Sequence, residues 1–204
     1  MASIEIPERD VALFRMLKED GVIHKIQPEL LKVNNGYIFA PCSDCDHFVD
    51  LGSHFSTLIK SAGKKMRPWP IPMPGGALWL ANSDLLNNKV GKSINEAMFF
   101  SADFAIREKG IRSFYPFSHA PCGAAGKFNL SLFDQFEIMD NAQEYIRNRY
   151  SDIPDLEVKS FFHVCYPGEI RKTRQISISK WRENIDKYVE FDYTPGRMFQ
   201  TAAG

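Results

Sequence analysis

Two short segments of the sequence carry side chains that bind transition metals. Cys42 and Asp44 lie in the first segment, and His119 and Cys122 lie in the second, much later in the chain. Thiolate and imidazole are the usual ligands of Zn²⁺, and a carboxylate is a further type that this ion accepts. With three protein ligands, zinc keeps a position for a water molecule and lowers the pKa of that water to roughly 7. Cys42, His119 and Cys122, with Asp44 as a candidate fourth ligand, therefore predict a zinc site.

The elements around these segments predict how the ligands meet. The apolar run at residues 36–40 predicts a buried strand that ends shortly before Cys42, and residues 111–117 predict a strand that ends just before His119. Between them, a capping sequence and apolar residues at helical spacing predict a helix over residues 93–110. Strands that alternate with helices indicate a parallel α/β sheet, in which ligands bind beyond the carboxyl ends of the strands. Both ligand groups are therefore expected at one edge of the sheet.

The same periodicities assign the rest of the chain. Residues 61–76 hold four prolines and three glycines, which exclude regular structure and predict the main loop. Further helices are expected at 7–18, 48–60, 131–150 and 181–189, and further strands at 77–81, 156–166 and 169–179, the last two joined by a turn at Pro167-Gly168. The expected fold is a mostly parallel central sheet flanked by helices, with an antiparallel C-terminal edge strand.

The composition is that of an ordinary globular domain. The 204 residues are 44% hydrophobic and 25% charged, and this length suits one domain, with a helical segment at 1–35 and a tail at 190–204. Lys plus Arg and Asp plus Glu each total 25, so no net field directs the protein to nucleic acid or a membrane. Since no secretory signal or membrane span is recognised, we expect a cytoplasmic protein. In a reducing compartment, its four cysteines suit metal binding or catalysis better than disulfides.

A second ligand set is open at the same place. Cys42 and Cys45 form a Cys-x-x-Cys sequence, and His119 and Cys122 complete a Cys3His set with the spacing of a structural zinc site. The fourth ligand is therefore Asp44, Cys45 or water, and a closed site with four protein ligands would serve binding or structure. A hydrolase with Cys122 as nucleophile is disfavoured because no third group that would orient His119 is evident.

Other polar residues have simpler interpretations. His47 and His54 are expected to be ordinary polar residues near a helix start. His163 and Cys165 alternate along a strand and therefore face the same side of it. The long loop carries three cations, Lys64, Lys65 and Arg67. A solvated surface is the simplest interpretation of this cluster, and binding of an anion or phosphate is the alternative.

The two metal-binding segments together resemble the β-class carbonic anhydrases. That family ends a strand in Cys-Ser-Asp-x-Arg and later carries His-x-x-Cys-Gly. This chain has Cys42-Ser43-Asp44-Cys45-Asp46 and His119-Ala120-Pro121-Cys122-Gly123, and the likeness covers most of residues 36–178, with the loop at 61–76 as an enlargement.

The resemblance implies a β-carbonic-anhydrase-like fold and a matching activity. Cys42, His119 and Cys122 would hold zinc, and zinc-bound hydroxide would attack CO2 to give bicarbonate. Asp44 would position or gate the water or, in a closed site, bind the metal. The family further implies a homodimer or a larger homo-oligomer.

Two positions depart from the family's pattern. The arginine that pairs with the aspartate and holds it off the metal is Asp46 here, and an arginine usual near Leu80 is absent. Because two neighbouring carboxylates repel each other, zinc becomes the most attractive partner for Asp44. A cation from the loop at 61–76 could replace the missing arginine. Carbonic anhydrase activity is therefore the leading interpretation, and a closed zinc-binding site without that activity is the alternative.

Overall fold

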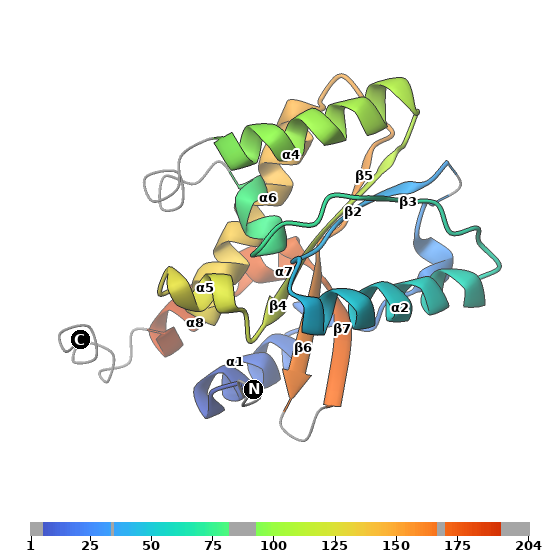
Figure 1. Ribbon diagram of the computed structural model, residues 1–204. Helices are drawn as coiled ribbons and strands as arrows, with labels where there is room; N and C mark the ends of the chain where they lie inside the picture. Colours follow the sequence, from blue (N-terminus) through green and yellow to red (C-terminus); the bar gives the residue numbers. More distant parts are fainter. Residues whose placement is uncertain (1–5, 34, 82–92, 167–169, 193–204) are drawn as a thin grey trace.

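The computed structural model describes residues 6–33, 35–81, 93–166 and 170–192 (Figure 1). These residues form a seven-stranded sheet in the order β1-β7-β6-β4-β2-β3, with β5 also paired with β4. The strands are β1 (Ile23–His24), β2 (Tyr37–Ala40), β3 (Pro68–Pro70), β4 (Ser113–Ala120), β5 (Glu157–Val158), β6 (Phe161–Tyr166) and β7 (Ile170–Ile176). Strands β2 to β6 pair in parallel, while β7 is antiparallel to both β6 and β1. The predicted α/β class, mostly parallel with antiparallel pairing at the C-terminal strand, is confirmed, and the short β1 covers that edge.

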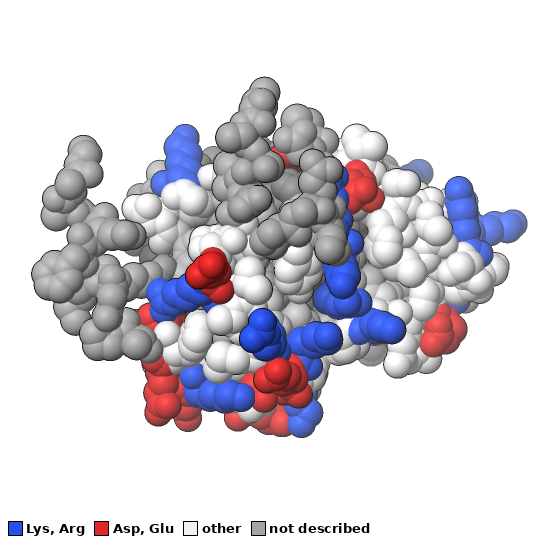
Figure 2. Space-filling model, turned by 90° about the horizontal axis from the view of Figure 1, so that it is seen from below, with Lys and Arg blue, Asp and Glu red and all other residues white. Residues whose placement is uncertain are grey.

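Helices cover both faces of the sheet (Figure 1). The α-helices are α1 (Glu8–Glu19), α2 (Cys45–Ser61), α4 (Ser93–Asp103), α5 (Gly123–Lys127), α6 (Leu132–Arg149), α7 (Ile178–Glu183) and α8 (Ile185–Asp192). Two short 3-10 helices, η1 (Pro28–Leu30) and η2 (Gly76–Leu80), and a π-helical turn, η3 (Phe104–Glu108), complete the described elements. Within the described residues, no helix is both long and apolar enough to cross a membrane. The face shown in Figure 2 carries Lys and Arg interspersed with Asp and Glu.

The face of the sheet under α2 has an aromatic core. Phe55 of α2 is fully buried, and its ring lies 5.1 Å from that of Phe117 in β4 and 5.2 Å from that of Phe161 in β6. Successive side chains of a strand point to opposite faces, so residues two apart share a face. His119, two residues after Phe117, therefore lies on this same face. The packing of α2 thus fixes the strand that carries His119.

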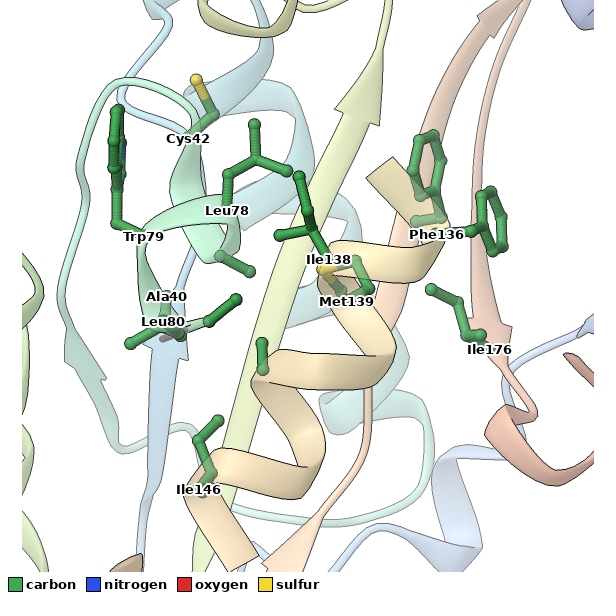
Figure 3. Close-up of a cluster of buried hydrophobic side chains, with 14 of the residues drawn as sticks. Ala40, Cys42, Leu78, Trp79, Leu80, Phe136, Ile138, Met139, Ile146 and Ile176 are labelled. Carbon is green, nitrogen blue, oxygen red and sulfur yellow. The ribbon is translucent and has the colours of Figure 1, made fainter. Parts of the chain in front are cut away.

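The opposite face holds the larger core. Figure 3 shows Leu78 and Leu80 of η2 beside the end of β2, with Ile138 and Met139 of α6 next to them. All four side chains are buried in one hydrophobic cluster. Burial of such side chains contributes roughly 1.5–3 kcal/mol each. η2 is held between α6 and the sheet. The residues just before η2, which contact the segment after β2, are therefore held in place as well.

The elements with clear periodicity lie where the sequence predicts them. α1, β2, α2 and α6 match their predicted ranges within a few residues, and the predicted helix at 93–110 is present as α4 followed by the π-helical turn η3. α6 begins with a reciprocal capping box: the Asp134 N–H donates to the Ser131 hydroxyl at 3.0 Å, and the Ser131 N–H donates to the Asp134 carboxylate at 2.6 Å. β4 extends further than predicted, so His119 lies inside the strand and not beyond it.

Two predictions between residues 61 and 81 are wrong. The apolar run at 77–81 is not a strand: η2 covers Gly76–Leu80, entered through two glycines at positive φ, Gly75 and Gly76. The loop at 61–76 is not wholly irregular, because β3 (Pro68–Pro70) pairs in parallel with β2. The Arg67 carbonyl accepts from Tyr37 N–H at 3.1 Å, and Ile71 N–H donates to the Phe39 carbonyl at 2.8 Å. Both prolines fit because an edge strand pairs on one side only and leaves alternate amides unused.

The C-terminal region is more divided than predicted. The segment at 156–166 forms two strands, β5 on β4 and then β6, and the helix expected at 181–189 is present as α7 and α8, which meet at Asn184. The predicted Pro167-Gly168 turn and the tail beyond Asp192 lie outside the described residues. β6 and β7 nevertheless pair antiparallel, from Phe161 with Gln175 to Tyr166 with Ile170.

Candidate metal site

Three of the predicted ligands lie together in the interior. Cys42, His119 and Cys122 each place one ligand atom within 4.8 Å of those of the other two. Their exposed fractions are only 6%, 2% and 8%. Cys42 follows β2, His119 lies in β4, and Cys122 is the residue directly before α5. The side chains expected to meet do meet, in a buried cluster that can hold a metal such as zinc.

The topology of the sheet explains this convergence. β2 and β4 are parallel neighbours, with Ala40 aligned with Pro116, so both strands deliver their next residues to the same edge. Beyond β2, Cys42 is held by the chain that follows β3: Ser43 N–H donates to the Met73 carbonyl at 3.1 Å, and Met73 N–H donates to the Pro41 carbonyl at 3.2 Å. Cys122, which follows the end of β4 and directly precedes α5, lies close to Cys42 at this edge.

A glycine pair that sequence reasoning did not assign to the site supports Cys42. Gly75 N–H donates a hydrogen bond of 3.1 Å to the Cys42 sulfur. Gly76 has φ +56°, and a Cβ built on it would lie 2.6 Å from Cys42 N and 2.6 Å from the Phe117 carbonyl oxygen. Only glycine fits that space without moving backbone. Two adjacent glycines directly before an apolar run were the sequence signal for this tight turn.

The two thiols shift each other's pKa in opposite directions. The pKa of Cys42 is lowered to about 4, first because the Cys122 thiol donates a hydrogen bond to its sulfur. His119 and the backbone of Asp44 act in the same direction, while burial opposes them. The pKa of Cys122 is raised, first by that same hydrogen bond to Cys42 and then by burial. Cys42 is therefore the thiolate of the pair, which is the form that binds metal.

The donor set fits a zinc ion. Two sulfurs and one imidazole nitrogen, mutually close and shielded from water, are the ligand types that zinc and other borderline-soft metals select. A thiolate is already favoured at Cys42 before any metal binds. When Cys122 also loses its proton, two negative charges face one divalent cation. Cys42, His119 and Cys122 are accordingly the residues that would hold such an ion.

Asp44 does not belong to this cluster. Among the described residues, the group of mutually close ligand atoms comprises Cys42, His119 and Cys122 without it. The Asp44 carbonyl accepts from Phe48 N–H at 2.7 Å, so its backbone forms the entry to α2. The half-buried Asp44 carboxylate lies near enough to Cys165 for its charge to raise the pKa of that thiol, behind the larger effect of burial. The role of Asp44 as a ligand or gate remains a prediction. The structure does not describe the side chains of Cys45, Asp46 and His47.

A polar group lies beside the cluster on the α2 face. His163 of β6 is aligned with His119 and is 1% exposed. Its Nδ1 lies 2.9 Å from the Thr173 hydroxyl, and its Nε2 lies 3.5 Å from an oxygen of Asp50 in α2. Arg171 of β7 reaches the same Asp50 oxygen at 3.6 Å. His163 is thus a buried residue with polar neighbours, a refinement of the core or sheet-surface role predicted for it, whereas His54 is exposed as expected.

The loop cations lie away from Asp44. Lys64 donates to the Glu29 carbonyl at 2.7 Å, which ties the loop to η1. Arg67 precedes β3 and aligns with the start of β2, at the amino ends of the parallel strands. Asp44 follows the carboxyl end of β2. The contacts of Lys64 and the position of Arg67 therefore do not support either as the replacement for the arginine that the sequence lacks at position 46.

Comparison with known proteins gives a structural likeness and no family. No family model matches the chain, and no curated protein matches it. Among solved structures, a carbonic anhydrase from Glaciozyma antarctica matches with 14% sequence identity and a TM-score of 0.36. The match covers 86% of this chain and 98% of that one. Similarity of this degree establishes neither family membership nor activity, and the chain's own buried Cys2His cluster carries the functional argument.

Proposed function

We propose that this protein uses zinc to hydrate carbon dioxide to bicarbonate, or to add water to a similarly small electrophile. The observation that carries the proposal is the buried cluster of Cys42, His119 and Cys122 at the carboxyl ends of parallel strands. Two thiolates and a neutral imidazole balance the charge of Zn²⁺. When bound, zinc would act as a Lewis acid and lower the pKa of a coordinated water to about 7.

The chain's own residues would shape this site. Gly75 N–H orients the Cys42 sulfur, and the aromatic core beneath α2 fixes the strand that carries His119. We assign Asp44 the role of accepting a hydrogen bond from the reacting water and orienting it. Because its carboxylate is not among the mutually close ligand atoms, this role is proposed in preference to direct coordination. Burial of the ligands restricts the site to a small substrate.

The sequence motifs favour carbon dioxide as the substrate. Cys42-Ser43-Asp44 and His119-Ala120-Pro121-Cys122-Gly123 resemble the zinc-binding segments of the β-class carbonic anhydrases. The parallel pairing of β2 and β4, with the first motif just after β2 and the second at the end of β4, is compatible with that resemblance. A homodimer or larger homo-oligomer, as that family implies, is part of the proposal.

A closed zinc site without this activity is the second candidate. It is favoured by Asp46, which stands where the resembling family has the arginine that restrains the aspartate, and by Cys45, which adds a thiol at the first residue of α2. The low exposure of all three central ligands also suits a structural site. In that case the metal would stabilise the fold and bind no substrate.

The two candidates are separated by measuring zinc content and CO2 hydration on the same protein. We expect about one zinc ion per chain in reduced wild type, and a zinc-dependent rate in stopped-flow hydration at neutral or alkaline pH. Cys165→Ser, which alters a half-buried thiol outside the cluster, serves as the control and should keep both. Stoichiometric zinc without a rate at any pH would leave the closed site. A lack of stoichiometric zinc would overturn both candidates.

Replacing Asp46 by arginine tests whether the missing cation limits the reaction. If the lack of an arginine at position 46 allows Asp44 to bind the metal, Asp46→Arg should raise the hydration rate at unchanged zinc content. Asp46→Asn removes the carboxylate without adding a cation and is the matched control. An equal rise in both variants would assign the effect to the removed negative charge, and no rise in either would exclude a defect at this position.

A further inference from the structure

A cavity lies at the end of the sheet opposite the metal site. Its volume is about 430 Å³, and it is lined by Asn35, Arg67, Pro68, Trp69, Lys109 and Ile111. These residues precede or begin β2, β3 and β4, whereas Cys42 and Cys122 follow the carboxyl ends of β2 and β4. A volume of this size lies within the range of small-molecule sites. The cavity is therefore distinct from the cluster of Cys42, His119 and Cys122.

Two cations of this cavity have no acidic partner in the described part of the chain. Both Arg67 and Lys109 are exposed, and neither forms a salt bridge with another described residue. The backbone at Arg67 is fixed, because its carbonyl accepts from Tyr37 N–H at 3.1 Å. Gly36, at φ +99°, permits this close approach, since a Cβ there would lie 2.8 Å from the Arg67 carbonyl oxygen. The guanidinium thus extends from a backbone held in place, without an acidic partner among the described residues.

The cavity has one aromatic lining residue, Trp69, and its indole is fixed in orientation. The Trp69 indole N–H donates to the Ser101 hydroxyl at 3.1 Å, and the indole stacks on Phe104 with ring centroids 5.8 Å apart and planes at 30°. Lys109 Nζ lies 5.4 Å from the centre of the Phe104 ring. Phe104 begins the π-helical turn η3, a rare conformation that recurs at functional sites. The turn places Phe104 and Lys109 on the same side, next to Trp69.

We propose that this cavity binds a small aromatic anion, with its ring against Trp69 and its carboxylate or phosphate at Arg67 and Lys109. A guanidinium and an ammonium on one cavity provide charge-assisted donors for such a group. An indole held by a hydrogen bond and a stacked neighbour offers a flat apolar surface without further loss of side-chain freedom. The proposal goes beyond the proposed function and does not depend on zinc.

The proposal is tested by titrating the protein with phenyl phosphate and with benzoate and following the indole N–H resonances by two-dimensional NMR. Trp69→Phe assigns the resonance of that residue among the three tryptophans. We expect saturable shifts of the Trp69 signal with both anions. Inorganic phosphate, which lacks the ring, and benzyl alcohol, which lacks the charge, should bind at least about tenfold more weakly. The titration is run with and without zinc and should give the same result.

Matched variants distinguish a built site from general surface charge. Arg67→Gln and Lys109→Gln should each weaken binding of phenyl phosphate about tenfold, while Arg67→Lys keeps much of it. Lys65→Gln removes an exposed cation of the same loop that does not line the cavity, and should leave binding unchanged. The spectrum of each variant without ligand reports whether it is folded. No saturable shift with either anion, or an equal loss in Lys65→Gln and Arg67→Gln, would overturn the proposal.

Discussion

Gly75 donates its backbone N–H to the sulfur of Cys42 at 3.1 Å. The hydrogen bond joins the turn that opens η2 to the segment that follows β2, two parts of the chain separated by α2 and β3. Gly76 completes the junction by lying against the backbone of both Cys42 and Phe117. The geometry of the cluster therefore depends on a turn that contributes no metal ligand.

Gly76→Ala should disrupt this junction. The new Cβ would lie 2.6 Å from two backbone atoms, and alanine at φ +56° is strained as well. We expect a loss of roughly 2–4 kcal/mol in the free energy of unfolding, from left-handed strain of about 1 kcal/mol and overpacking of 1–3 kcal/mol. Urea denaturation measures the loss, and zinc affinity should fall with it.

Gly63→Ala is the matched control for that change. Gly63 has a similar φ of +70°, but a Cβ there meets nothing within 4 Å. This variant should lose only the strain of about 1 kcal/mol and keep its zinc affinity. Equal losses of unfolding free energy in the two variants would show that the close contact of residue 76 with Cys42 and Phe117 does not affect stability.

Cys42→Ser should abolish tight zinc binding and the stabilisation that accompanies it. Since loss of a supporting hydrogen bond alone costs 10–100-fold in metal affinity, loss of a thiolate ligand should cost more than about 100-fold. Wild type should gain about 2.7 kcal/mol in stability at a free zinc concentration 100 times its Kd, and Cys42→Ser should gain less than about 0.4 kcal/mol at the same zinc concentration. Thermal melts with and without zinc measure this difference. Cys165→Ser should behave as wild type, and an equal loss of stabilisation there would point to a different ligand set.

Short sequence patterns predict the features of this protein that depend on neighbouring residues in the chain. The length and strand-forming composition of the apolar runs at β2 and β4, and the types of Cys42, His119 and Cys122 at or after their ends, suffice to place three ligands at one edge of a parallel sheet. The helical periodicity of α6 is equally local. In each case one physical requirement, burial of one face or choice of a metal ligand, determines the pattern.

Other features depend on long-range contacts that a local pattern does not contain. An apolar run such as Ala77–Ala81 is compatible with a strand or with a buried helix, and the pocket between α6 and the sheet decides in favour of η2. Prolines argue against a strand at residues 68–70, yet an edge position tolerates them.

Asp20→Asn should flatten the acid side of the stability curve. Asp20 at the end of α1 accepts from Lys187 at 2.7 Å and from the Tyr188 hydroxyl at 2.7 Å, both in α8. These bonds, that of Lys187 first, lower the pKa of Asp20 below the usual value of an aspartate. A lowered folded-state pKa contributes stability that is complete above the unfolded value and disappears as pH falls through the folded value.

At neutral pH the Asp20→Asn change should cost about 1 kcal/mol, because both charged groups are partly exposed. A change of that size lowers the melting temperature by about 2–4 °C in a chain of this length. Asp186→Asn, an exposed carboxylate of α8 without an ion pair among the described residues, should cost less than about 0.5 kcal/mol. Melts over a pH series from neutral to acid test this, and parallel curves for wild type and Asp20→Asn would contradict it.

Phe55→Ala should weaken the packing that holds α2 on the sheet. Phe55 is 0% exposed and contacts the rings of Phe117 and Phe161, on the strands that carry His119 and His163. Truncation of a buried phenylalanine costs about 3–5 kcal/mol through lost burial and the cavity left behind. Because α2 also begins directly after Asp44, we expect zinc affinity to fall about tenfold even in the fraction that remains folded.

Val49→Ala, on the same helix but 71% exposed, should change stability by less than about 0.5 kcal/mol and leave zinc binding intact. Denaturation with zinc titration of both variants separates the outcomes: loss of stability with wild-type zinc affinity would show that α2 supports the fold but does not position the site.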